Sequence, residues 1–124
     1  MSWIDKVNQW ALKGIRLKAV ERVETDDLGS TLIQGDGNHF IRWSDVQEIA
    51  VLKQPSLARG SFAVAIRGAG STLTIVDDTV AGFAEFCQEI TRRLKDVVPY
   101  ETWAVELTAS PQQTGKVIFR RTPN

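Results

Sequence analysis

The sequence is poor in the residues that build disulfides and metal sites. It contains one cysteine and one histidine among 124 residues. A single cysteine cannot form an internal disulfide, so the chain needs no oxidising compartment and we expect a cytoplasmic location. A single histidine cannot build a histidine-based metal cluster. We therefore expect no metal site and no other cofactor.

An excess of charge of one sign is also missing. Lys and Arg number 15 and Asp and Glu number 15, so the formal net charge is zero. Proteins that bind nucleic acids usually gain most of their affinity by neutralising phosphates with an excess of basic residues. The balance therefore predicts that nucleic acid is not a partner.

Long apolar runs are absent too. The longest is Phe62–Ile66, whereas a membrane-spanning helix needs about 20 apolar residues. The first 14 residues have neither the basic start nor the continuous apolar stretch of a signal peptide. We therefore predict that the chain has no integral membrane segment.

What remains is the composition of an ordinary globular domain. Hydrophobic residues make up 43% and charged residues 24% of the chain. The length fits one domain with one core. We predict a single domain over 1–124, made of an N-terminal helix (1–14), a core (15–98) and a C-terminal hairpin extension (99–124).

Residues 79–96 show the most regular apolar periodicity. Apolar side chains recur there at spacings of three and four residues, which is typical of one buried helix face. They are Val80, Phe83, Cys87, Ile90 and Leu94, widened by Phe86 and Ala84. Asp77, Asp78 and Thr79 are suited to cap the start of a helix, and basic residues occupy the last turns. The pattern predicts one long helix over 79–96.

A shorter stretch near the start shows the same spacing. Trp3, Val7, Trp10 and Ala11 fall on one face, which predicts a short helix over 3–14. That face has three interpretations: it packs on the protein's own sheet, it lies in a membrane interface, or it forms a dimer contact.

Between the two helices the apolar pattern changes to period two. Turn-forming residues at 25–30 and 35–38 separate short alternating segments, which predicts six strands over 15–77. The tail alternates at Trp103, Val105 and Leu107 and again at 116–120, which predicts a C-terminal β-hairpin. The fold class is therefore α+β: a bent antiparallel sheet or partly open barrel, covered by the helix over 79–96.

Two stretches within this order resemble a known family. Phe40–Ile49 reads FIRWSDVQEI, and Gly82–Phe86 reads GFAEF with a pair of phenylalanines. This order is similar to the bacterial pleckstrin-homology-like (PH-like) domains over residues 16–95. The resemblance implies a scaffold that usually binds proteins, peptides or membranes and rarely catalyses. Relatives that bind phosphoinositides carry Lys and Arg around the first hairpin, whereas Glu24–Gly29 is acidic here, so the resemblance does not extend to that ligand.

Two residue pairs offer catalytic chemistry. His39 and Cys87 would suit nucleophilic catalysis, and Asp77 and Asp78 would suit acid–base chemistry. Cys87, however, lies on the apolar stripe, where a thiol is inert, and the two aspartates lie where a helix cap is needed. We therefore predict no catalytic residues, and a small hydrolase-type enzyme stays as an alternative.

Three groups of residues are candidates for binding. Asp26 and Asp27 form an acidic turn that suits a basic partner, such as a toxin neutralised by an immunity-type protein. Arg120 and Arg121 at the end of the chain lie near Lys116 in sequence and, together with the basic end of the long helix, form a candidate basic patch. The third group is Trp3 and Trp10, on the first helix.

These observations predict a non-catalytic binding module. Its partner would be another protein, bound through a sheet edge or through loops, and strand addition at an exposed edge is the natural mode. Peripheral membrane association through Trp3 and Trp10 is the alternative from another class. The sequence leaves the identity of the partner and the oligomeric state open.

Overall fold

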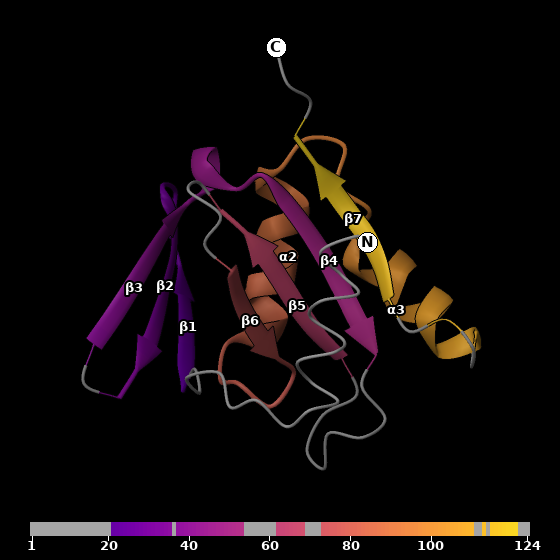
Figure 1. Ribbon diagram of the computed structural model, residues 1–124, viewed down its shortest axis with the longest axis horizontal. Helices are drawn as coiled ribbons and strands as arrows, with labels where there is room; N and C mark the ends of the chain where they lie inside the picture. The colour runs from indigo at the N-terminus through magenta and orange to yellow at the C-terminus, as the bar shows by residue number, and fades with distance from the viewer. Residues whose placement is uncertain are drawn as a thin grey trace.

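The computed structural model describes residues 21–35, 37–53, 62–68, 73–110, 113 and 115–121. The predicted helix over 3–14, with Trp3 and Trp10, lies outside these residues. The described chain is α+β, with a three-stranded and a four-stranded antiparallel sheet and two α-helices (Figure 1). The elements in chain order are β1 (Arg22–Thr25), β2 (Gly29–Gln34), β3 (Gly37–Arg42), the 3-10 helix η1 (Trp43–Asp45), β4 (Glu48–Lys53), β5 (Phe62–Arg67), β6 (Leu73–Asp77), α2 (Phe83–Arg93), α3 (Tyr100–Ala109) and β7 (Gly115–Arg120).

Sheet A consists of β1, β2 and β3 in that order, joined by two tight turns. The first turn is closed by the Asp26 carboxylate, whose Oδ1 accepts hydrogen bonds from the N–H groups of Leu28 at 2.8 Å and Gly29 at 3.1 Å. The second lies between the paired residues Gln34 and Gly37, and Gly35 has a φ of +50° there. Both turns were predicted from their residue types.

Sheet B contains the central strands of the molecule, in the order β6-β5-β4-β7. Helix α2 covers one of its faces (Figure 1). The core residues Ile49, Val51, Val64 and Val76 are fully buried. The sheet also carries a second, smaller buried cluster, formed by Leu52, Ala63 and Ala65 with Ile75 packed against it. Sheet B is therefore apolar on both faces, which is why its strands read as nearly continuous apolar runs.

The two sheets do not close into a barrel, and the predicted α+β class with antiparallel strands is confirmed. Sheet A is joined to the rest of the fold by the outer edge of β1, where the Val23 N–H donates to the Ala81 carbonyl at 3.0 Å. Residue 81 belongs to the connection between β6 and α2 and makes a single bridge with Arg22 rather than a strand. A short bridge of this kind joins the sheets without closing them.

Helix α2 confirms the predicted apolar stripe but is shorter than the predicted 79–96. Val80, Phe83, Phe86, Cys87, Ile90 and Leu94 are all buried, whereas Ala84, which was predicted to widen the stripe, is exposed. The helix begins at Phe83 because Gly82 precedes it in a left-handed conformation, with φ +87°, and it ends at Arg93 because Leu94 is extended. The predicted cap at Asp77, Asp78 and Thr79 is therefore wrong, since a turn separates these residues from the helix.

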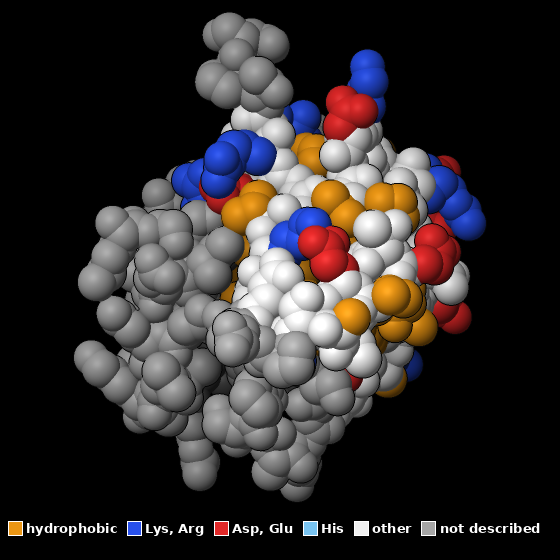
Figure 2. Space-filling model, turned by 90° about the vertical axis from the view of Figure 1, so that its right-hand side faces the viewer, with side chains coloured by type: hydrophobic (Ala, Val, Ile, Leu, Met, Phe, Trp, Pro, Cys, Tyr) orange, Lys and Arg blue, Asp and Glu red, His pale blue; other side chains and the backbone are white. Residues whose placement is uncertain are grey.

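The C-terminal hairpin is the clearest error of the sequence prediction. The segment predicted as its first strand is helix α3, in which Trp103 and Leu107 are buried one turn apart and Val105 is 68% exposed. The Trp103 ring packs edge-on against Tyr100 and Phe62, with centroids at 5.0 and 5.6 Å. Figure 2 shows this side of the molecule, where apolar side chains are scattered among charged ones.

The second strand of the predicted hairpin does form, as β7, but its partner is β4. Trp43, which lies within the span predicted to form strands, instead begins η1. Neither α2 nor α3 is long and apolar enough to cross a membrane, and the same is true of any helix in the described ranges.

Candidate functional site

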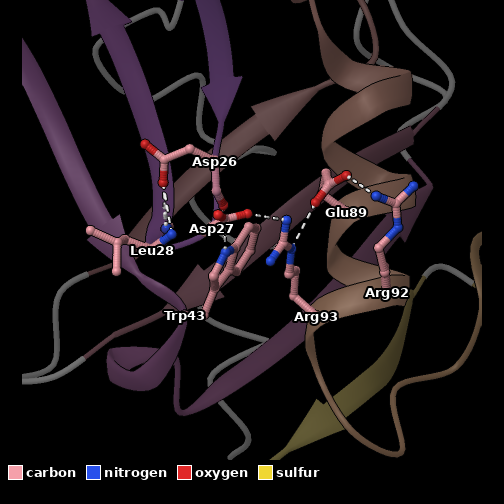
Figure 3. Close-up of polar contacts among 8 residues, drawn as sticks. Asp26, Asp27, Leu28, Trp43, Glu89, Arg92 and Arg93 are labelled. Carbon is pink, nitrogen blue, oxygen red and sulfur yellow. Dashed lines mark hydrogen bonds and ion pairs between the residues drawn. The ribbon is translucent and has the colours of Figure 1, made fainter.

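The acidic turn between β1 and β2 makes contacts within the fold. Asp26 uses its carboxylate to close the turn, and its backbone carbonyl accepts a hydrogen bond from Trp43 Nε1 at 3.0 Å. The Asp27 carboxylate forms an ion pair with Arg93 Nη2 at 2.7 Å (Figure 3). Both aspartates are nevertheless exposed, and the Asp27 side chain is 89% exposed.

Arg93 links this turn to helix α2. Its Nε donates to Glu89 at 3.0 Å, one helical turn earlier, and Glu89 also pairs with Arg92 at 3.1 Å. The hydrogen bonds to Glu89 and then Asp27 raise the pKa of Arg93 above its ordinary value. Figure 3 shows these side chains joined between the turn and the helix. The contacts tie one end of sheet A to the element that covers sheet B.

Arg120 belongs to an ion-pair cluster across sheet B that is centred on a buried carboxylate. Glu48 on β4 is only 3% exposed and faces Arg67 on β5 and Arg120 on β7. Its two carboxylate oxygens accept hydrogen bonds from Arg67 Nη2 at 2.8 Å and Arg120 Nη2 at 3.0 Å. A buried carboxylate is costly unless it is paired, and two guanidinium groups satisfy this one. The sequence prediction missed the role of Glu48.

Arg121 holds the 3-10 helix against the end of β7. Its Nε donates to the Val46 carbonyl at 2.9 Å and its Nη2 to the Trp43 carbonyl at 3.0 Å. Its guanidinium also lies over the Phe119 ring, 5.6 Å from the centroid. The side chain is therefore fixed in place although its charge faces no carboxylate among the residues that the structure describes.

An open groove lies where η1, the end of α2 and the end of β7 meet. Its volume is about 510 Å³. Its lining residues are Trp43, Ser44, Arg93, Leu94, Lys95, Asp96, Phe119, Arg120 and Arg121. The predicted basic patch is thus assembled in part. Arg92 and Lys116 do not line the groove, and Lys116 pairs with Glu106 at 2.7 Å instead.

The other candidate surface is the outer edge of β3, the last strand of sheet A. The Trp43 N–H donates to the Leu28 carbonyl, and the turn joins the paired residues Gln34 and Gly37. These two contacts show which residues of β3 form hydrogen bonds with β2, because such residues alternate along an antiparallel pair. Residues 37, 39 and 41 direct their backbone groups to β2, and Asn38, Phe40 and Arg42 direct theirs outward. No strand in the described part of the chain pairs with this edge.

The structure places the two residues considered for nucleophilic catalysis on different elements, His39 on β3 and Cys87 on α2. Cys87 is buried in the core, and burial, followed by the nearby charge of Asp78, raises its pKa to about 12. The thiol is therefore protonated at neutral pH and has little nucleophilic character. His39 is exposed on β3, on the other sheet. The Asp78 carboxylate accepts a hydrogen bond from the Phe62 N–H at 3.2 Å, a contact that ties the end of β6 to the start of β5.

Within the described ranges, no three His, Cys, Asp or Glu side chains gather closely enough to hold a metal ion. Trp3 and Trp10 lie outside these ranges, so the membrane-binding interpretation of their face stays a prediction. Comparisons of the chain with protein-family models, curated proteins and solved structures found no match.

Proposed function

We propose that the protein is a non-catalytic binding module that receives an extended segment of a partner protein at the outer edge of β3. The observation that carries this proposal is that no described strand pairs with this edge. The backbone N–H and C=O groups of Asn38, Phe40 and Arg42 alternate along it with the spacing that an added strand needs.

The side chains of β3 support the same proposal. Natural edge strands are usually protected by proline, by several charges or by a covering element. This strand has no proline, and Arg42 is its only permanently charged residue. Phe40 is 43% exposed on it and offers an apolar contact to the side chain of an incoming strand.

Two other sheet edges already carry contacts. The outer edge of β1 bonds to Ala81, and the outer edge of β7 accepts a hydrogen bond from the Val98 N–H at the Ile118 carbonyl, at 2.9 Å. The edge of β3 has no comparable contact with any described residue. This difference favours β3 over β1 and β7 as the docking strand.

The finer predictions remain part of the proposal. A PH-like relationship is supported by the order of six antiparallel strands followed by an amphipathic helix, although here a second helix and a seventh strand follow. A cytoplasmic location is supported by the single cysteine, which is buried and free. The immunity-type version depends on Asp27, which is exposed but already paired with Arg93.

Amide hydrogen exchange tests the proposal directly. A partner would first be captured from a lysate of the source organism with the tagged protein and identified. Exchange at single residues would then be measured with and without that partner. We expect the amides of Asn38, Phe40 and Arg42 to exchange rapidly in the free protein and to become protected in the complex. A complex in which these three amides still exchange at the free rate would refute strand addition.

A matched pair of variants separates the contribution of the Phe40 backbone to partner binding from that of its side chain. Phe40→Ala removes the ring and keeps the outward N–H, whereas Phe40→Pro removes both. Proline is tolerated where an edge N–H faces solvent, so the β2–β3 ladder should survive. We expect Phe40→Pro to weaken partner binding at least tenfold more than Phe40→Ala. Equal affinities of the two folded variants would contradict the proposal.

A further inference from the structure

We propose that the groove between η1, the end of α2 and the end of β7 is a second binding site, for an acidic peptide segment. It is separate from the outer edge of β3 and does not depend on strand addition there. The argument rests on the charges that line the groove, on how they are held, and on the aromatic rings beside them.

The charges of the groove favour an anionic ligand. Arg93, Lys95, Arg120 and Arg121 line it, against one carboxylate, Asp96. Arg93 and Arg120 have carboxylate partners in Asp27, Glu89 and Glu48. Lys95 and Arg121, in contrast, form no ion pair with any residue in the described ranges. These two cations are left to recognise a ligand.

Arg121 is held ready for such a ligand. Two of its N–H groups donate to the carbonyls of Val46 and Trp43, and its guanidinium lies over the Phe119 ring. A guanidinium carries five N–H donors, so further donors remain for a carboxylate. Because the side chain is already fixed, a ligand loses less conformational entropy in binding it than in binding a free surface arginine.

The shape of the groove favours a peptide over a small inorganic anion. The cations come from two separate parts of the chain, one at the end of α2 and one at the end of β7, and the aromatic residues Trp43 and Phe119 lie beside them. A volume of about 510 Å³ is larger than one small anion fills. An extended segment in which carboxylate and apolar side chains alternate matches both features.

Fluorescence anisotropy with a defined probe tests this inference. The probe is a labelled peptide of alternating Glu and Leu, and the reference is the same peptide with Gln in place of Glu. We expect saturable binding of the Glu peptide, weakened by added salt because the contacts are ionic. Equal binding of the Gln peptide would overturn the inference.

Two single-charge variants at the end of α2 locate the site. Lys95→Gln removes a cation that lines the groove, and Arg92→Gln removes one that does not. Because no hydrogen bond or ion pair of Lys95 to a described residue exists, its variant should fold normally. We expect Lys95→Gln to weaken peptide binding about three- to tenfold and Arg92→Gln to leave it nearly unchanged. Equal losses would show nonspecific attraction and refute the site.

Further experiments distinguish an acidic peptide from other anionic ligands and distinguish this inference from strand addition at β3. If inorganic phosphate at millimolar concentration displaces the peptide completely, the groove is a simple anion site and the peptide inference fails. If the protein binds anionic lipid vesicles but not the peptide, it fails as well. Phe40→Pro should leave peptide binding intact, so failure of strand addition and failure of the groove are distinguishable.

Discussion

The two sheets of the molecule differ in what their strands contact. In sheet B, every residue of β4 except Lys53 is buried, and four consecutive residues of β5 are buried. In sheet A, every residue of β3 is exposed except the half-buried Ile41. Sheet B thus holds most of the core, and sheet A adds Val23 and Leu32 to the same cluster. Strand β3 lies on the outer side of sheet A, and no strand in the described ranges pairs with its outer edge.

This difference shows where substitution should affect stability and where it should affect binding. Sheet B derives its stability from apolar burial on both faces and from a paired buried carboxylate. Sheet A is held by Val23 and Leu32, which pack in the main core, and by the Val23–Ala81 bond, the Trp43 indole and the Asp27–Arg93 pair. Strand β3, which is exposed except for the half-buried Ile41, can offer its outer edge to a partner without disturbing the core.

The largest effect should come from removing a core ring. Phe86 on α2 is fully buried, whereas Phe40 on β3 is 43% exposed. Phe86→Ala should lower the free energy of unfolding by about 3–5 kcal/mol, because it leaves a cavity under sheet B. Phe40→Ala should change it by less than about 0.5 kcal/mol. Urea unfolding followed by circular dichroism measures both, and similar losses would show that the exposed ring of β3 contributes to stability as much as a core ring does.

The next prediction compares how much an ion pair of each sheet contributes to stability. Glu48→Gln in sheet B leaves Arg67 and Arg120 without their carboxylate, and breaking a buried pair costs about 3–5 kcal/mol. Because Arg120 is largely exposed and Gln can still accept a hydrogen bond, we expect the lower end of that range or less.

The control lies in sheet A, where Glu24→Gln breaks the exposed pair with Arg22 and should cost less than about 0.5 kcal/mol. The same unfolding measurement applies to both variants. A loss at Glu48 no larger than that at Glu24 would mean that the buried cluster contributes nothing to stability.

Local patterns predicted the central helix and the turns. The stripe from Val80 to Leu94 is buried as expected, because its periodicity depends only on the helix and one covered face. The turns at Asp26 and Gly35 followed from residue types that favour them. Such features are encoded within a few neighbouring residues, and for that reason a single sequence reveals them.

Features that depend on distant contacts could not be predicted in the same way. The spacing of Trp103, Val105 and Leu107 fits a strand, but Trp103 and Leu107 also lie one helical turn apart. The choice between strand and helix therefore depends on how Trp103 packs against Phe62 and Tyr100. Some residues of the predicted basic patch line one groove. The contacts that hold Arg120 and Arg121 there, however, come from Glu48 and η1, more than 70 residues away in sequence.

The buried thiol of Cys87 gives a pH test of the core around α2. Its pKa is raised from 9.0 to about 12, mainly by burial, so the folded state keeps a proton that the unfolded state loses between these values. The contribution to stability is therefore complete below pH 9 and is lost as pH rises toward 12. Unfolding experiments should show a steeper decline over this range for the wild type than for Cys87→Ala.

Labelling with a thiol reagent gives an independent readout at neutral pH. Cys87 should react only when urea unfolds the protein, because the folded thiol is both buried and protonated. Rapid labelling without urea would show that α2 separates easily from sheet B and would revive Cys87 as a reactive group.

The smallest effect concerns the contact between the acidic turn and α2. Asp27→Asn removes a carboxylate that pairs with Arg93, but Arg93 keeps Glu89, and the Asp27 side chain is 89% exposed. Asp26→Ala, in contrast, removes the acceptor of two backbone hydrogen bonds and should cost about 1 kcal/mol. We expect the urea midpoint of Asp27→Asn to be indistinguishable from wild type in high salt and slightly lower at low salt, since screening weakens an exposed pair. If Asp27→Asn destabilises the protein more than Asp26→Ala, the ion pair to α2, rather than the turn, holds this end of sheet A in place.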